Sequence, residues 1–189
     1  PFASGYFPTV LGEYVALKTA RQRLLMTSAL CLAGMLVLVW SEFRSLRITA
    51  LFAASLPFAL VGGVIGVALS GGVLSLGSLV GFVTVVGISA RTGIMLLAHY
   101  QHLEHEEGEA FGPALILRGA SERLIPILMT AACAGLALVP LIVTGNAPGH
   151  EIEYPMAIVI LGGLASSTVL NLLLMPALYA RFGHRAAAS

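Results

Sequence analysis

Five long runs of apolar residues, interrupted by a single charge, constrain this chain more than any other feature. A helix needs about 20 apolar residues to cross the roughly 30 Å of hydrocarbon in a bilayer. Each run is too long for a strand, and none alternates apolar with polar residues as barrel strands do. The runs predict five membrane-spanning helices, at about residues 24–40, 48–69, 73–100, 124–143 and 155–179.

The composition supports a membrane protein and excludes other classes. Hydrophobic residues make up 58% of the 189 residues and charged residues 10%, whereas an average soluble domain has about 25% charged residues. The net charge of +1 offers no basic surface for a nucleic acid. We therefore expect an all-α polytopic helix bundle that is embedded in a lipid bilayer and binds no nucleic acid.

The charged segments divide the chain into expected parts. Residues 1–23 form a link segment, residues 24–183 the helix bundle and residues 184–189 a tail. Within the bundle, residues 101–123 carry five Glu and two His. The apolar residues of this segment recur at helical spacing, which predicts one interfacial helix in addition to the five spans. These apolar residues are Phe111, Leu115 and Ile116.

The distribution of Lys and Arg predicts the orientation, because short cytoplasmic loops are enriched in both residues. One side of the predicted bundle holds Arg44, Arg47, Arg118, Arg123, Arg181 and Arg185, and the two loops of the other side hold no Lys or Arg. The link segment is therefore expected in the periplasm and the tail in the cytoplasm. Because the chain starts at Pro1 and has an odd number of spans, we expect it to be a portion of a longer protein.

Arg91 is a charge in the middle of the third span. Eighteen uncharged residues precede it and nine more follow before Gln101. A charge at this depth costs at least about 2.5–3.5 kcal/mol, so it is expected to pair with an opposite charge or to line a wet cavity. Because none of the five spans contains an acid, the spacing predicts a partner carboxylate on a helix outside this chain.

Three polar residues are candidate companions of Arg91. Thr92 adjoins it, and Arg123 and Thr130 lie seven residues apart at the start of the fourth span. Seven residues are nearly two helical turns, so Arg123 and Thr130 share a face. A threonine inside a span also commonly donates a hydrogen bond to the carbonyl four residues earlier. Spacing alone therefore leaves open whether Thr130 accompanies Arg91 or only bonds to its own helix.

These segments resemble the resistance–nodulation–division (RND) efflux pumps. Residues 81–95 (GFVTVVGISARTGIM) are similar to the tenth transmembrane helix of that family, and residues 122–130 (ERLIPILMT) to the start of its eleventh. Residues 148–155 (PGHEIEYP) are similar to the approach to the twelfth helix, and the ordered match extends over about residues 24–183.

Two features of the resemblance favour the heavy-metal branch of the family. Arg91 stands where drug pumps usually carry Lys, and residues 148–152 contain the Pro-Gly-x-Glu-Ile run of that branch. Thr92, in contrast, replaces the usual Asn. The resemblance implies a multi-pass protein of the bacterial inner membrane that contains no cofactor and is not an enzyme.

The resemblance also implies partners and a proton relay. RND pumps exchange protons for their substrates, here metal cations, and work as homotrimers with a periplasmic adaptor and an outer-membrane channel. This chain would supply spans eight to twelve and pack against the N-terminal half of the same transporter. The basic and hydroxyl residues of the relay map to Arg91, Arg123 and Thr130, with Thr92 beside them. The acidic carriers of the family lie on span four, outside this chain.

Alternative functions are weighed against this interpretation. His99, His102 and His105 recur every three residues, but their order matches no zinc-protease motif, and a solvated helix face explains them better. His150 with its neighbouring Glu151 and Glu153 is a weak site for metal entry. An intramembrane hydrolase would need an aspartate pair, a GxSxG serine or a zinc motif, and the sequence has none of these.

A structural role is the second interpretation that stays open. A split or truncated gene product could pack against another polypeptide without transporting anything itself. The presence of a carboxylate near Arg91 discriminates between transport and a structural role. A chain without such a carboxylate has no group that carries protons.

Overall fold

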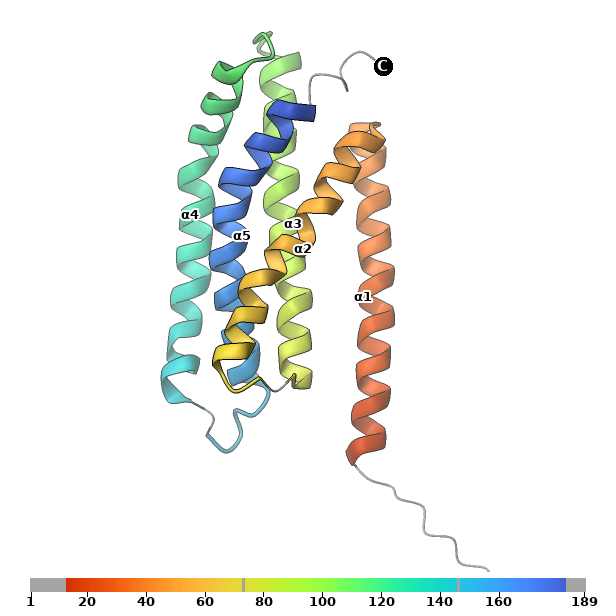
Figure 1. Ribbon diagram of the computed structural model, residues 1–189, viewed down its shortest axis with the longest axis vertical. Helices are drawn as coiled ribbons and strands as arrows, with labels where there is room; N and C mark the ends of the chain where they lie inside the picture. The colour runs from red at the N-terminus through yellow and green to blue at the C-terminus, as the bar shows by residue number, and fades with distance from the viewer. Residues whose placement is uncertain (1–12, 73, 146, 183–189) are drawn as a thin grey trace, which may run out of the picture.

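The computed structural model describes five helices over residues 13–72, 74–145 and 147–182 (Figure 1). They are α1 (Glu13–Phe43), α2 (Leu46–Leu69), α3 (Leu76–His105), α4 (Pro113–Thr144) and α5 (Glu153–Phe182). No strand occurs among the described residues. The predicted all-α membrane bundle is confirmed. The first twelve residues of the expected link and the whole expected tail lie outside the described residues.

Each helix is longer than the apolar run that predicted it. The shortest, α2, has 24 residues and a length of about 36 Å at about 1.5 Å per residue, which exceeds the hydrocarbon thickness of a bilayer. All five helices are long and apolar enough to cross a membrane. Polar residues extend them, because a helix satisfies its backbone hydrogen bonds in water as well as in lipid.

The helices α2 to α5 form a bundle, and α1 stands beside it (Figure 1). In the most apolar stretch of α5, 39% of the residues are buried. The corresponding share is 6% in α1 and 0% in α4. The central helix is therefore α5, which contacts α2, α3 and α4. The outer faces of α1 and α4 are open and apolar, as expected of surfaces that meet lipid or other membrane helices.

The two ends of the bundle differ in their loops. The α1–α2 and α3–α4 loops and the last turn of α5 lie at one end, the upper one in Figure 1, which we call the α3–α4 end. The α2–α3 and α4–α5 loops lie at the other end. In the α2–α3 loop, Gly71 and Gly72 have φ angles of 109° and 74°, which side chains other than glycine rarely adopt. These two glycines therefore allow the tight turn between α2 and α3.

Small residues bring α2 and α5 close together. A Cβ atom added to Gly62 would overlap the carbonyl oxygen of Gly162, so only glycine permits this approach. The Oγ of Ser166 accepts a hydrogen bond from the backbone N–H of Gly62 (3.1 Å) and donates to the carbonyl of Ala59 (3.0 Å). Such close packing of small residues is typical of helices in membranes, and a hydrogen-bonded serine reinforces it here.

The interfacial helix expected between the third and fourth spans is not a separate element. Instead, α3 continues to His105, a loop follows, and α4 begins at Pro113 and runs without a break to Thr144. Leu115 and Ile116, expected to face the membrane surface, are 0% and 8% exposed. They pack against the core around Tyr100 of α3. Leu115 and Ile116 lie in a helix as predicted, but their face meets a neighbouring helix rather than the membrane surface, and Phe111 lies in the loop before α4.

Candidate functional site

A groove between α3 and α4 contains all four residues predicted for the relay. Its volume is about 120 Å³. The residues that line it are Arg91, Thr92, Met95 and Leu96 of α3, and Arg123, Pro126, Ile127 and Thr130 of α4. Each set repeats at intervals of three or four residues, which places its members on one face of the helix. The two faces meet because α4 returns antiparallel beside α3 after the short loop at the α3–α4 end.

Arg91 lies at the centre of α3. Fourteen residues separate it from the end of the helix at His105, a distance of about 21 Å along the axis. Its side chain is exposed on the surface of the bundle. Among the described residues, none forms a hydrogen bond or an ion pair with its guanidinium. Arg91 is thus a mid-membrane cation for which the described part of the chain provides no anion.

Arg123 adds a second cation to the groove. Its side chain is half-buried, and its Nη2 lies 3.4 Å from Nδ1 of His99. Its Nε is buried and has no hydrogen-bond partner among the described residues. An unpaired buried N–H group is costly, so the guanidinium has a free donor for a further acceptor.

The two hydroxyl groups of the groove are bonded to their own helices. The Oγ1 of Thr92 donates to the carbonyl of Ile88 (3.0 Å), and that of Thr130 donates to the carbonyl of Pro126 (2.8 Å). With its proton committed in this way, each hydroxyl oxygen still has lone pairs that accept hydrogen bonds. The hydroxyls can therefore accept bonds from a guanidinium, water or a protonated carboxyl group.

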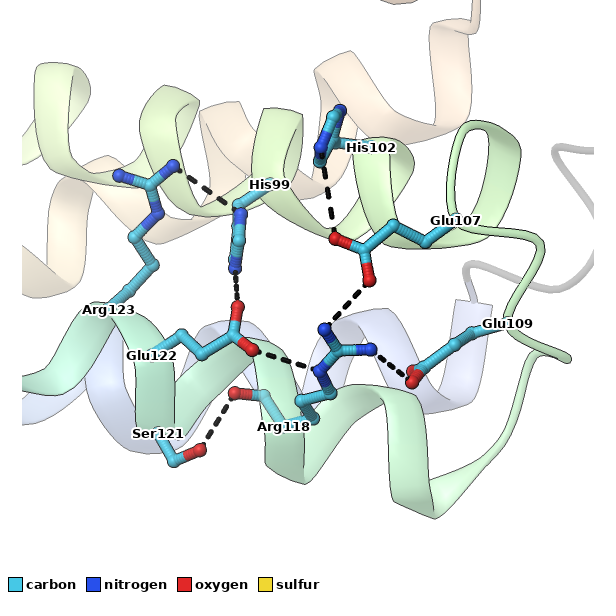
Figure 2. A network of polar contacts seen from close by, with 8 residues as sticks. All are labelled: His99, His102, Glu107, Glu109, Arg118, Ser121, Glu122 and Arg123. Carbon is cyan, nitrogen blue, oxygen red and sulfur yellow. Dashed lines mark hydrogen bonds and ion pairs between the residues drawn. The ribbon is translucent and has the colours of Figure 1, made fainter.

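A cluster of charged side chains joins the end of α3, the α3–α4 loop and the start of α4 (Figure 2). Arg118 of α4 donates from Nε to Glu122 (2.9 Å), from Nη2 to Glu107 (2.7 Å) and from Nη1 to Glu109. Arg118, Glu107, Glu109 and Glu122 are here called the Arg118 cluster. The side chains of the cluster are 32% to 41% exposed, so solvent weakens each pair, and the cluster fixes the geometry of the loop more than it stabilises the fold.

The structure also reveals a buried polar layer that the sequence analysis missed. Asn171 of α5 is 3% exposed, and its Nδ2 donates to Oγ of Ser89 on α3 (3.4 Å). A small cavity of about 10 Å³ lies between this layer and the hydroxyls of Thr92 and Thr130. Asn171 is the one amide in the uncharged run of residues 155–179, and it follows the polar residues Ser166, Ser167 and Thr168; an amide in a membrane span was the signal available. Polar groups therefore extend from the groove into the centre of the bundle.

The histidines form no metal centre, because no group of three metal-ligating side chains occurs among the described residues. His102 pairs with Glu106 (2.9 Å), and His105 contacts a carbonyl of its own helix. In the α4–α5 loop, His150 pairs with Glu153 (2.9 Å). Hydrogen bonds from its own backbone N–H and that of Gly149 hold the pKa of Glu151 below its usual range, so this carboxylate is engaged by the loop.

A bundle of five apolar helices with two arginines in a groove between α3 and α4 defines an integral membrane protein with charges among its membrane-spanning helices, which is typical of ion-coupled transporters. The family model of the AcrB/AcrD/AcrF family matches residues 2–183, and the chain belongs to this family. The recognition of an RND protein from the sequence is thereby confirmed.

The relatives that match this chain include metal-resistance proteins. It is 37% identical over 183 residues to the cobalt-zinc-cadmium resistance protein CzcA of Cupriavidus metallidurans, covering 96% of this chain and 17% of the relative. It is 36% identical over 168 residues to the nickel and cobalt resistance protein CnrA of the same organism, covering 88% of this chain and 15% of the relative. The chain thus spans about one sixth of the length of these proteins.

A solved structure shares the fold. The crystal structure of a heavy metal efflux pump, in its second crystal form, superposes with a TM-score of 0.78 at 36% sequence identity. The match covers 92% of this chain and 17% of that chain. Over 92% of this chain, the helix arrangement described above is therefore similar to that of the matching part of this heavy metal efflux pump.

Proposed function

We propose that this chain is the C-terminal membrane portion of a proton-driven RND transporter that exports heavy-metal cations. In this proposal the groove supplies the basic and hydroxyl members of the proton relay, namely Arg91, Arg123, Thr130 and Thr92. The observation that carries it is the meeting of two guanidinium and two hydroxyl groups in one mid-membrane groove without a carboxylate. The metal-resistance relatives support heavy-metal cations as the substrate class.

The relay needs a group that binds and releases protons, and the groove residues do not provide one. Arginine stays charged at every physiological pH, and a threonine hydroxyl does not ionise. All nine acids of the chain are Glu, and none lies within the central turns of a helix. The carboxylates are therefore assigned to a helix of the N-terminal half of the same transporter, packed against the open face of Arg91.

Pairing between such a carboxylate and Arg91 gives two states. An ionised carboxylate is held by the guanidinium, and a protonated carboxyl group is released from it. Since the ionised carboxylate favours the paired state and the protonated carboxyl group the separated state, proton binding shifts the helix that carries the carboxylate. The hydroxyl oxygens of Thr92 and Thr130 accept a hydrogen bond from the protonated carboxyl group, which stabilises the second state.

The proposal places the protein in the bacterial inner membrane, with the α3–α4 end in the cytoplasm. Arg44, Arg47, Arg118, Arg123 and Arg181 lie at or near that end, and the α2–α3 and α4–α5 loops contain no Lys or Arg. Membership of the family supports a homotrimer with a periplasmic adaptor and an outer-membrane channel.

Cysteine labelling tests this orientation. After alanine replaces the exposed Cys31 and Cys133, the variant Pro148→Cys is expected to react with an impermeant maleimide added outside the inner membrane. Glu106→Cys is expected to react only once the membrane is opened. Reaction of Pro148→Cys from the cytoplasmic face alone contradicts the orientation.

Transport by the complete protein tests the function itself. Reconstituted in vesicles with an imposed pH gradient, the complete transporter that contains this chain is expected to move Zn²⁺ while it dissipates the gradient. The chain alone is expected to match empty vesicles, because it has no mid-membrane carboxylate. Zn²⁺ movement by the chain alone contradicts the assignment of the proton carrier to another helix.

A structural module without transport activity is the second candidate. The exposed side chain of Arg91 supports this candidate, because an arginine without a partner carboxylate cannot relay protons. In this case the complete protein shows no Zn²⁺ movement coupled to protons, although this chain inserts and packs normally. The vesicle experiment therefore separates the two candidates.

A further inference from the structure

One imidazole connects the groove to the Arg118 cluster. His99 of α3 has a side chain that is 12% exposed, and its Nε2 lies 2.7 Å from Oε2 of Glu122 (Figure 2). Its Nδ1 lies 3.4 Å from Nη2 of Arg123. Arg123 lines the groove, and Glu122 belongs to the cluster. The ring thus lies between a cation on the side of the groove and an anion on the side of the solvent.

The two partners determine which nitrogen carries the proton. A guanidinium only donates hydrogen bonds, so Nδ1 of His99 must accept the bond from Arg123. The hydrogen of the neutral ring therefore sits on Nε2, from which it is donated to Glu122. In this tautomer the ring has a lone pair toward the groove and a proton toward the Arg118 cluster.

We infer that His99 is the residue through which protons leave the groove at the α3–α4 end; this rests on the proposed function. A proton released by the carboxyl group in the groove travels through water and binds to Nδ1, forming a new N–H bond. The N–H bond at Nε2 then breaks, and its proton passes to an oxygen of Glu122. Glu122 releases that proton to water. The ring now carries its hydrogen on Nδ1; once the ring has turned toward solvent, water takes that hydrogen and returns one to Nε2, which restores the starting tautomer without net proton movement.

The charged and titratable groups around the ring define the route that a proton on His99 can take. From α4, Glu122 and Arg123 face His99, with Arg118 behind Glu122; from α3, the ring of His102 lies parallel at 6.5 Å. Hydrogen bonds from Arg118 and His99 stabilise the ionised form of Glu122, so Glu122 passes a proton on rather than keeping it, and the 40% exposure of its side chain lets water remove that proton. The pathway therefore ends in solvent.

Proton binding at His99 also changes the position of Arg123. A protonated Nδ1 has no lone pair, and the imidazolium repels the guanidinium, so the contact between the two side chains must break. The freed Arg123 can then turn toward an acceptor in the groove, where its Nε has no partner among the described residues. Proton exit through His99 and the position of the Arg123 guanidinium therefore depend on each other.

The variant His99→Gln tests the inference with little change in shape. The glutamine amide can accept from Arg123 and donate to Glu122, which keeps the bridge, but it cannot bind a proton. His105→Gln is the matched control, because His105 lies on the same helix and contacts only a carbonyl of its own helix through its ring. Both are measured in the complete transporter, in vesicles, as Zn²⁺ movement and proton flux at equal protein abundance.

We expect His99→Gln to lower the transport rate by roughly tenfold or more. This loss is smaller than the largest losses seen when a positioned proton donor is removed, because water still carries part of the proton flux. The remaining rate is expected to depend less on the pH at the α3–α4 end than the wild-type rate does, because the glutamine amide does not bind a proton. His105→Gln is expected to keep the rate and the pH profile of the wild type.

Three results separate the possible explanations. A wild-type rate and pH profile in His99→Gln, with a loss only in His99→Phe, overturns the inference and leaves His99 as a structural bridge. Equal losses in His99→Gln and His105→Gln also overturn it. If the wild-type transporter shows no proton-coupled Zn²⁺ movement at all, the proposed function fails first, and the inference falls with it.

Discussion

Replacing Arg91 with alanine is expected to lower proton-coupled transport by the complete protein to about a hundredth of its rate, with insertion unchanged. A cation in contact with a carboxylate changes its affinity for a proton by roughly 10- to 1000-fold. Without Arg91, the facing carboxyl group keeps its proton, and the helix that carries it stays in one state. Zn²⁺ efflux from vesicles, at matched membrane abundance of each variant, measures the effect.

Two further substitutions make this prediction specific. Arg91→Lys keeps the positive charge but loses the forked donor geometry, so it is expected to retain part of the activity. Thr130→Ala is expected to have a milder effect than Arg91→Ala, because water can replace one hydroxyl in an exposed groove. Wild-type efflux from Arg91→Ala would show that Arg91 is a structural charge only.

Gly62→Ala is expected to destabilise the folded bundle by about 1–3 kcal/mol, the usual range for a group forced into a filled space. The added Cβ would overlap the carbonyl oxygen of Gly162, a backbone atom that cannot turn aside as a side chain can. The shift would also weaken the hydrogen bond between the N–H of Gly62 and Ser166. Unfolding of the purified protein in detergent, followed by circular dichroism, measures the free energy.

Gly34→Ala is the matched control for this packing prediction. No atom lies within 4 Å of a Cβ added at Gly34, which occupies an open face of α1. The substitution is expected to be neutral or to stabilise the helix by up to about 1 kcal/mol, because alanine loses less backbone entropy on folding than glycine. Similar losses of stability in the two variants would show that the close approach of α2 and α5 does not limit stability.

The groove and the crossing of α2 with α5 have different roles in the same bundle. Gly62 and Gly162 draw two helices together and leave no space between them. Between α3 and α4, in contrast, Arg91 and Arg123 line an open groove. We expect Gly62→Ala to lower the free energy of unfolding first, and Arg91→Ala to lower only the transport rate. Both quantities can be measured on the same set of purified variants.

Much of the fold and of the candidate site could be predicted from the sequence. The number of spans follows from the length of each apolar run, because a helix must satisfy its backbone inside the bilayer and needs about 20 residues to cross it. Arg91 was identified because a charge in the middle of such a run is costly. The shared face of Arg123 and Thr130 was predicted from helical periodicity, and the groove confirms it.

Only the tertiary structure determined which faces meet. Periodicity shows which residues share one side of a helix, but not which neighbour that side contacts, because this depends on the packing of whole helices. For this reason Leu115 and Ile116 were assigned to the membrane surface, whereas they pack against Tyr100. For the same reason the bonds of His99 to Glu122 and Arg123 could not be predicted, since those residues lie 23 and 24 positions away in the sequence.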